Sequence, residues 1–320
     1  MGSGTETENL ASARIPKFNE GTTWSKEGIT VAGSKRWGTS LAHLNFPSYM
    51  YVDDDENVYI TDYSNNRVVV WKDGATTGEM VIGEGAQIER SDRLRNPKDI
   101  ILDKATDSFI IADEGNRRIA QWSRKNDSGI KTIIPDILAS SIALDHEGYL
   151  YVCDYENHEV KRYKIGETTG VVVAGGHGKG AKLKHLSHPM CIFVDKEQSV
   201  YVSDWGNHRI VKWEKGAKVG QVVAGTNKYY SVDPESLADP FGLIVDEDRN
   251  VYVADWGKHR IVRWEPGAPK GTVIVGEGTM GNGSTQLSRP FGIAFDRRGN
   301  LYVSDFCNQR VQKFMINTPE

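Results

Sequence analysis

Residues 201–213 read Tyr-Val-Ser-Asp-Trp-Gly-Asn-His-Arg-Ile-Val-Lys-Trp, and similar stretches occur five more times in the chain of 320 residues. Each copy contains one aspartate at the same place, here called the repeat aspartate. The repeat aspartates are Asp62, Asp113, Asp154, Asp204, Asp255 and Asp305. Their spacings are 51, 41, 50, 51 and 50 residues. A period of this length indicates a solenoid or a propeller, in which each repeat forms one supersecondary unit.

Each repeat predicts four short strands. In the fourth repeat an apolar first strand begins at Pro189, a polar turn follows, and residues 201–204, 208–213 and 221–225 predict the other three strands. Aspartate and glycine in the turns suit the backbone angles of tight hairpins. Four antiparallel strands per repeat are typical of a propeller blade. We therefore predict an all-β, six-bladed propeller.

The two ends of the chain predict how the ring closes. The last repeat ends after its third strand at residues 312–314, and residues 28–33 supply a spare fourth strand. This N-terminal strand should complete the last blade, because closure removes the open sheet edges. The propeller is expected over residues 25–316. Residues 1–24 are expected to be a flexible tail, an artificial leader or a surface strap.

The repeat resembles the NHL repeat family. The resemblance rests on the pattern P-x-x-I-x-x-D followed by G-N-x-Y-V-x-D-x-x-N-H-R-I, and it covers residues 28–314. Asn207-His208-Arg209 and Asn157-His158-Glu159 match the tripeptide that gives the family its name. The family includes RNA- and protein-binding domains of tripartite-motif proteins, sensor domains and the propeller of peptidyl-hydroxyglycine amidating lyases. The resemblance therefore implies a fold but leaves the function open.

Composition bears on nucleic-acid binding, on membrane spans and on the cellular compartment. The net charge of −4 gives no overall electrostatic case for nucleic-acid binding, and no run of about 18 apolar residues is present. Three cysteines, Cys153, Cys191 and Cys307, favour reduced thiols and a cytoplasmic protein. Sequons at Asn126 and Asn282 also fit an extracellular protein whose signal peptide was removed.

Features present in nearly every repeat are predicted to be structural. An aromatic residue stands nine positions after each repeat aspartate and should pack between blades. An arginine stands five positions after, except at Glu159, and should pair with the aspartate. The aromatic residues are Trp71, Trp122, Tyr163, Trp213, Trp264 and Phe314.

Three histidines occupy one repeat position, which raises the question of a zinc site. We predict no such site for His158, His208 and His259, because equivalent turns of a six-fold ring lie about 10 Å or more apart. Zinc needs its nitrogen ligands at about 2.0–2.1 Å. In the amidating lyases, histidines directly after the first-strand proline hold the metal. The matching residues here are Ser48, Lys98, Ser140, Met190, Phe241 and Phe291. No cofactor is predicted, and calcium in the central channel stays open.

The residues after the repeat aspartates predict a binding face. They are Tyr63, Glu114, Tyr155, Trp205, Trp256 and Phe306. Phe241 and Phe291 should lie beside them, closer to the axis. Such a ring of aromatic residues either packs under the long loops or supplies flat anchors for a ligand. The loop 175–189 adds three lysines, and its segment Lys182–His188 is a second candidate, whereas loop 225–240 carries a net charge of −2.

These observations favour a monomeric, non-catalytic binding platform. Its top face, formed by the long loops and the turns after the repeat aspartates, should engage a protein or peptide. One alternative is a metal-assisted lyase or hydrolase with its site at the channel mouth. The other is binding of single-stranded RNA.

Overall fold

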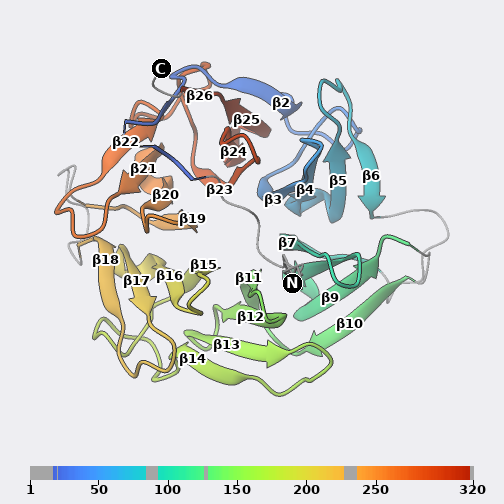
Figure 1. Ribbon diagram of the computed structural model, residues 1–320. Coiled ribbons are helices and arrows are strands. Elements are labelled where there is room, and N and C mark those ends of the chain that lie inside the picture. The colour runs from blue at the N-terminus through green and yellow to red at the C-terminus, as the bar shows by residue number, and fades with distance from the viewer. Residues whose placement is uncertain (1–16, 20, 84–92, 126–128, 227–235, 318–320) are drawn as a thin grey trace, which may run out of the picture.

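The computed structural model describes residues 17–19, 21–83, 93–125, 129–226 and 236–317. The strands in these residues form six four-stranded antiparallel sheets arranged as blades around a central axis (Figure 1). The apolar first strand of each blade lies nearest the axis, and the fourth strand lies at the rim. The predicted six-bladed β-propeller is thus confirmed.

The strands of the first three blades lie close to the predicted positions. Blade 1 contains β3 (Pro47–Val52), β4 (Val58–Asp62), β5 (Arg67–Trp71) and β6 (Glu79–Ile82). Blade 2 contains β7 (Pro97–Asp103), β8 (Ser108–Asp113), β9 (Arg118–Ser123) and β10 (Ile130–Pro135). Blade 3 contains β11 (Ala139–Leu144), β12 (Tyr149–Asp154), β13 (Glu159–Lys164) and β14 (Val171–Gly175).

The other three blades repeat this order. Blade 4 contains β15 (Pro189–Val194), β16 (Val200–Asp204), β17 (Arg209–Trp213) and β18 (Gln221–Gly225). Blade 5 contains β19 (Pro240–Val245), β20 (Val251–Asp255), β21 (Arg260–Trp264) and β22 (Thr272–Val275). Blade 6 contains β23 (Pro290–Phe295), β24 (Leu301–Asp305), β25 (Arg310–Phe314) and, from the other end of the chain, β2 (Ile29–Gly33).

The ring closes through the N-terminal strand, as predicted. Strand β2 pairs antiparallel with β25, so that Ile29 faces Lys313 and Gly33 faces Arg310. Residues nearly 300 positions apart in the sequence therefore belong to one sheet (Figure 1). This pairing gives β25 a hydrogen-bonded neighbour on both sides.

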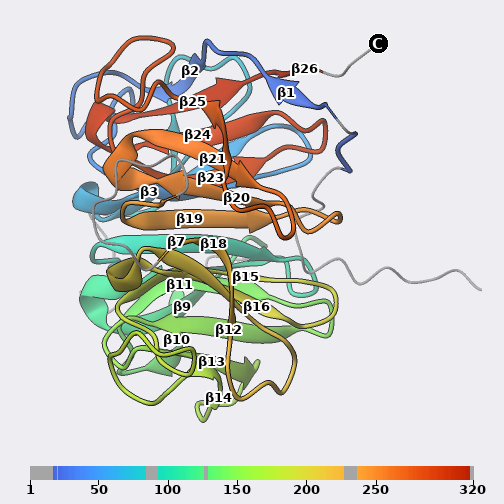
Figure 2. The same ribbon diagram turned by 90° about the vertical axis from the view of Figure 1, so that its left-hand side faces the viewer.

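The described part of the N-terminal segment belongs to the folded domain. Phe18 and Trp24 are buried, and the Trp24 indole donates a hydrogen bond of 2.8 Å to the carbonyl of Gly299. Strand β1 (Thr23–Trp24) pairs with β26 (Ile316–Asn317) on the side of the disc away from the short helical turns (Figure 2). These residues form a surface strap, one of the alternatives that the sequence left open, because two large aromatic side chains pack against blades 5 and 6. Residues 1–16 and 20 lie outside the described part.

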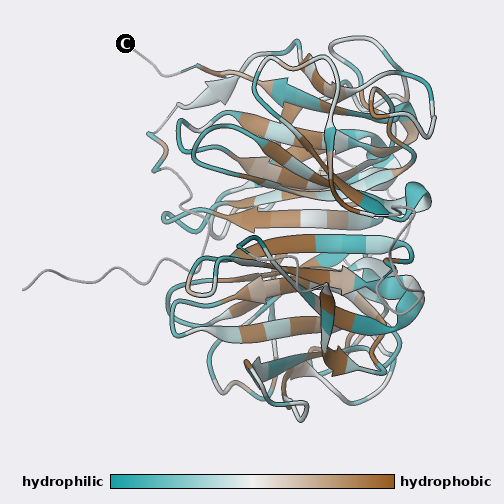
Figure 3. Cartoon of the chain, turned by 90° about the vertical axis from the view of Figure 1, so that its right-hand side faces the viewer, coloured by the Kyte–Doolittle hydropathy of each residue, from teal (hydrophilic) through white to brown (hydrophobic). Residues whose placement is uncertain are grey.

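The hydrophobic core lies within and between the blades. Apolar residues follow the strands, while polar residues gather in the turns (Figure 3). Of the repeated aromatic residues, Trp122 is half-buried and the others are buried. Their predicted role in packing is confirmed. The three cysteines are free thiols, and Cys153 and Cys191 are buried.

The repeat aspartate pairs with the arginine within its own blade. Five blades contain this ion pair, with nitrogen–oxygen distances of 2.7–2.8 Å. The second carboxylate oxygen accepts the backbone amide of the residue 17 positions earlier, or 18 in blade 2, at 2.6–2.7 Å. The pair thus fixes the long loop that precedes each of these blades.

Deleting residues 1–34 tests the closure. The deletion removes β1 and β2 and exposes the edge of β25, so the protein should aggregate or lose much of its stability. Thermal unfolding and light scattering measure both effects, with a variant lacking residues 1–16 as the control that keeps the strap. A monomeric truncated protein with an unchanged melting temperature would contradict this role of β2.

Candidate functional site

The top face is built by turns that the strands hold in nearly identical shapes. Five repeat aspartates lead into a short 3-10 turn, and each turn ends at a residue with left-handed backbone angles. Each turn is tied to the long loop before its blade, as in the 2.8 Å bond from the Gly206 amide to the Ser187 carbonyl. These turns gather on one side of the disc (Figure 2). Turns and loops therefore share this face, as predicted.

Blades 4 to 6 bring most of the predicted aromatic residues together. The Phe241 ring lies 4.5 Å from Phe291 and 5.6 Å from Trp256, measured between ring centroids. Phe291 stacks on Phe306 at 5.1 Å, and Trp205 contacts Phe241 at 6.5 Å. We call these five residues the aromatic sector. All five are among the residues for which the sequence predicted a place on this face.

The aromatic sector has a buried floor and a partly exposed rim. Phe241 and Phe291 are buried, whereas Trp205, Trp256 and Phe306 are half-buried. Trp205 also has an indole nitrogen that is buried without a hydrogen-bond partner. The sequence allowed two interpretations of these residues, packing under the long loops or anchoring a ligand. The rim residues are partly packed and partly exposed, so they fit each interpretation in part.

The mouth of the central channel is polar on the side formed by blades 1 to 3. Glu114 replaces the aromatic residue in blade 2, and its carboxylate lies 2.9 Å from the ammonium of Lys98, which is buried. Burial, followed by the nearby Glu114 carboxylate, raises the pKa of Tyr63. Tyr155 lies 5.8 Å from the Lys98 ammonium and 5.1 Å from the His188 ring. The structure thus places Tyr63 and Tyr155 beside an ion pair, while Tyr155 also packs against the hydrophobic cluster that contains Phe241 and Phe291.

Side chains fill the mouth of the central channel. The residues after the first-strand prolines, and Ser140 at the matching place in blade 3, are all buried. One layer below, the Asp99 carboxylate accepts hydrogen bonds from the Ser141 hydroxyl at 2.8 Å and the Ile142 amide at 2.9 Å. Burial raises the pKa of Asp99 to about 6, and these bonds act against the rise.

The three equivalent histidines link neighbouring blades. Each Nδ1 accepts a backbone amide from the next loop: His158 from His188 at 3.2 Å, His208 from Asp239 at 3.2 Å, and His259 from Arg289 at 3.1 Å. The Asn66 and Gln309 side-chain oxygens accept equivalent amides in other blades. The histidines therefore serve as inter-blade acceptors, a role that the sequence analysis missed. Within the described residues, no group of three or more metal-ligating side chains lies close enough to hold an ion.

The second predicted binding segment joins the top face only in part. His188 contacts Trp205, with 5.9 Å between ring centroids, at the border of the aromatic sector. Lys182 is exposed and accepts a hydrogen bond from His185 through its backbone carbonyl. Residues 227–235, which supply much of the predicted negative loop, and the sequon at Asn126 lie outside the described residues.

Two functional candidates at the sector were missed by sequence reasoning. Phe46 precedes the first-strand proline of blade 1, is partly exposed and lies 4.8 Å from Phe306. Arg289 holds the same position in blade 6, and its guanidinium lies 4.4 Å from the centroid of Trp256. The sequence feature that could have identified both residues is their position directly before the first-strand proline of a blade.

Comparison with known proteins agrees with this geometry. The NHL repeat family model matches residues 44–71 and 287–314. The chain is a six-bladed β-propeller that contains NHL repeats at these two places. A comparison with curated proteins gives no match. No helix in the described residues has the length and apolar character needed to cross a membrane.

Solved structures share the fold at low sequence identity. An auxiliary nutrient binding protein from Bacteroides thetaiotaomicron is 16% identical with a TM-score of 0.70, over 92% of this chain and 76% of that one. A virginiamycin B lyase from Staphylococcus aureus, solved with quinupristin, is 12% identical with a TM-score of 0.57, over 92% and 99%. A nidogen/laminin complex is 17% identical with a TM-score of 0.58, over 77% and 83%.

The link through His259 should make stability depend on pH. Burial, then Arg289, lowers the pKa of His259, so the unfolded chain binds a proton before the folded one. The contribution of His259 to the free energy of unfolding should therefore fall as pH drops below about 6.5. His259→Gln keeps an acceptor, as Gln309 does, and should remove part of this fall. Solvent screening limits the expected difference to about 1 kcal/mol.

Urea unfolding of both proteins at neutral and mildly acidic pH measures this contribution. Equal losses of stability in the wild type and His259→Gln would show that the imidazole does not titrate against folding.

Proposed function

We propose that this protein is a binding platform whose aromatic sector engages a protein or peptide partner. The observation that carries the proposal is the half-exposed rim of Trp205, Trp256 and Phe306 on a buried phenylalanine floor. Soluble monomers rarely keep a contiguous apolar patch of this kind without using it. Aromatic side chains held rigid by packing are also the common anchors of protein interfaces.

The polar surroundings support a peptide ligand. The guanidinium of Arg289 stacks over Trp256, and loop 175–189 brings exposed lysines beside the turn that carries Trp205. Across the mouth, the Lys98–Glu114 ion pair supplies both a donor and an acceptor. A peptide offers backbone carbonyls and amides together with apolar side chains, so it complements both halves of the mouth.

The names of similar propellers fit a binding role. Among them are the auxiliary nutrient binding protein and the nidogen/laminin complex. In this chain, most polar groups that recur from blade to blade have structural roles, since the aspartates hold loops and the histidines link blades. The residues that differ between blades are therefore the best carriers of specificity.

Replacing the rim tryptophans tests the proposal. Peptides selected from a random displayed library on the wild-type protein should bind Trp205→Ala and Trp256→Ala more weakly by about 2 kcal/mol or more, because each variant removes an anchor. Isothermal titration calorimetry measures the affinities. Trp37→Ala, which removes a tryptophan that is 72% exposed outside the sector, is the matched control.

Measuring the folding stability of the same variants shows whether a tryptophan acts in binding or in packing. The inter-blade variant Trp213→Ala should lose about 3–5 kcal/mol of folding stability, and the two rim variants should lose clearly less. Failure to select any peptide, or equal binding by the rim variants, would contradict the proposal. A preference for single-stranded oligonucleotides over peptides would contradict it as well.

A further inference from the structure

The junctions between blades contain a second, independent candidate site. The residue six positions before each repeat aspartate has left-handed backbone angles and lies in the turn between the first and second strands. Where the ring closes, and again between blades 4 and 5, this turn lies beside the third strand of the preceding blade, at the residue eight positions after the repeat aspartate. We call each such pairing of turn and strand a seam. Because the six seams are equivalent, their side chains can be compared directly.

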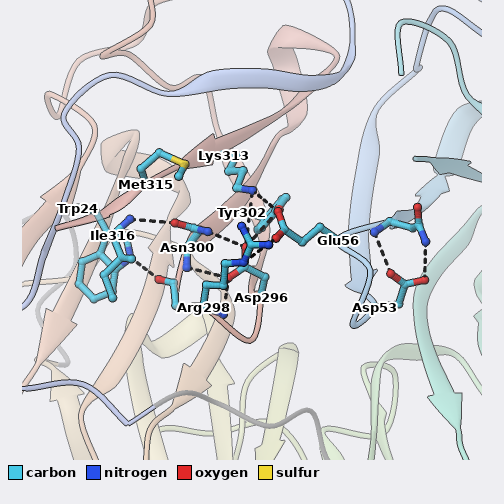
Figure 4. A network of polar contacts seen from close by, with 12 residues as sticks. Trp24, Asp53, Glu56, Asp296, Arg298, Asn300, Tyr302, Lys313, Met315 and Ile316 are labelled. Carbon is cyan, nitrogen blue, oxygen red and sulfur yellow. Dashed lines mark hydrogen bonds and ion pairs between the residues drawn. The ribbon is translucent and has the colours of Figure 1, made fainter. Parts of the chain in front are cut away.

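The seam that closes the ring shows how charge is balanced at this place. Glu56 of blade 1 extends to blade 6, where its carboxylate lies 2.6 Å from the ammonium of Lys313 (Figure 4). It also lies 3.1 Å from the guanidinium of Arg298, and Lys313 is 3.7 Å from Asp296. Glu56 and Lys313 are both buried. A carboxylate here neutralises two cations.

Two other seams are filled in different ways. Between blades 3 and 4, the Gln198 amide donates a 2.8 Å hydrogen bond to Asp145. Between blades 5 and 6 the turn residue is Gly299, and a Cβ at that position would lie 2.7 Å from Ile316 and 2.9 Å from Phe18. The strap with Trp24 therefore occupies the space at this seam.

The seam between blades 4 and 5 places two cations around a pocket. The turn residue is Arg249, in the place of Glu56, and the strand residue is Lys212, in the place of Lys313. Both line a pocket of about 440 Å³, together with Tyr201, Gln221 and Trp264. Opposite charges meet at the closing seam, whereas like charges meet here.

Neither cation has a close anionic partner within the described residues. The Lys212 side chain is only 13% exposed, and its nearest carboxylate oxygen, on Glu214, is 4.0 Å away. Its ammonium lies 5.4 Å from the centroid of the Tyr201 ring. The guanidinium of Arg249 is exposed and has no hydrogen bond or ion pair to the described residues. A largely desolvated cation with only a long ion pair is costly.

We propose that this pocket binds a small anion through a carboxylate or phosphate group. The anion would take the place that the Glu56 carboxylate occupies at the closing seam, between the two cations. Arginine and lysine both donate charge-assisted hydrogen bonds to such groups. Two acidic residues, Glu214 and Glu265, also line the pocket, but their side chains are 76% and 60% exposed, so solvent screens their charge. The site lies away from the top face, so it does not depend on the proposed peptide binding.

Titration calorimetry with inorganic phosphate and with malonate, at constant ionic strength, tests the site. At least one of the two anions should bind once per chain, while chloride should not. Arg249→Gln and Lys212→Gln should each weaken binding by about tenfold or more, because each removes one charged donor. Malonate binding alone would identify a carboxylate site, and phosphate binding alone a phosphate site.

A charge reversal distinguishes binding from a structural role. Arg249→Glu copies the closing seam and should pair with Lys212, so it should abolish anion binding while keeping or raising the melting temperature. Arg298→Gln, at the closing seam, is the control and should bind the anion like the wild type. The proposal is wrong if the wild type binds neither anion, or if Arg249→Glu binds as tightly as the wild type.

Discussion

The ion pair between the repeat aspartate and the arginine five residues later is the interaction on which the top face depends. In blade 4 the Asp204 carboxylate lies 2.7 Å from the Arg209 guanidinium and accepts the Ser187 amide at 2.6 Å. Arg209 in turn donates to the carbonyl of Ala181 in the same loop. Burial raises the pKa of Asp204, and its hydrogen-bond donors act against the rise. Since burial disfavours the charged form, the pair contributes mainly by fixing one loop conformation.

Blade 3 shows that the pair exists to hold a loop. Glu159 replaces the arginine there, and the preceding repeat spacing is 41 residues instead of about 50. Strand β10 ends at Pro135 and β11 begins at Ala139, so there is no long loop with carbonyls for an arginine to hold. The Asp154 carboxylate accepts a local amide from Asn157, and Lys161 lies 2.6 Å from Glu159. Loss of the loop and loss of the arginine therefore occur together.

The sequence predicted what depends on local, repeated patterns. Blade number, strand order and ring closure followed from spacing, because each blade uses the same short-range turns. The burial of Phe18 and Trp24 was not predictable, since neither residue belongs to a repeat. The links from His259 to Arg289 join residues 30 positions apart and depend on the angle between blades. The opposite charges at one seam and the like charges at another likewise appear only once turn and strand are paired in space.

The difference between repeated and non-repeated residues also guides the assignment of function. Groups repeated around the ring hold the scaffold, and binding is proposed where blades differ. A double-mutant cycle of unfolding free energies on Asp204→Asn and Arg209→Met tests that division most directly. Each single variant should lose about 3–5 kcal/mol, because it leaves a buried charge or donor unpaired, and the double variant should lose much less than the sum. Single losses below about 1 kcal/mol that simply add would contradict a structural role for the pair.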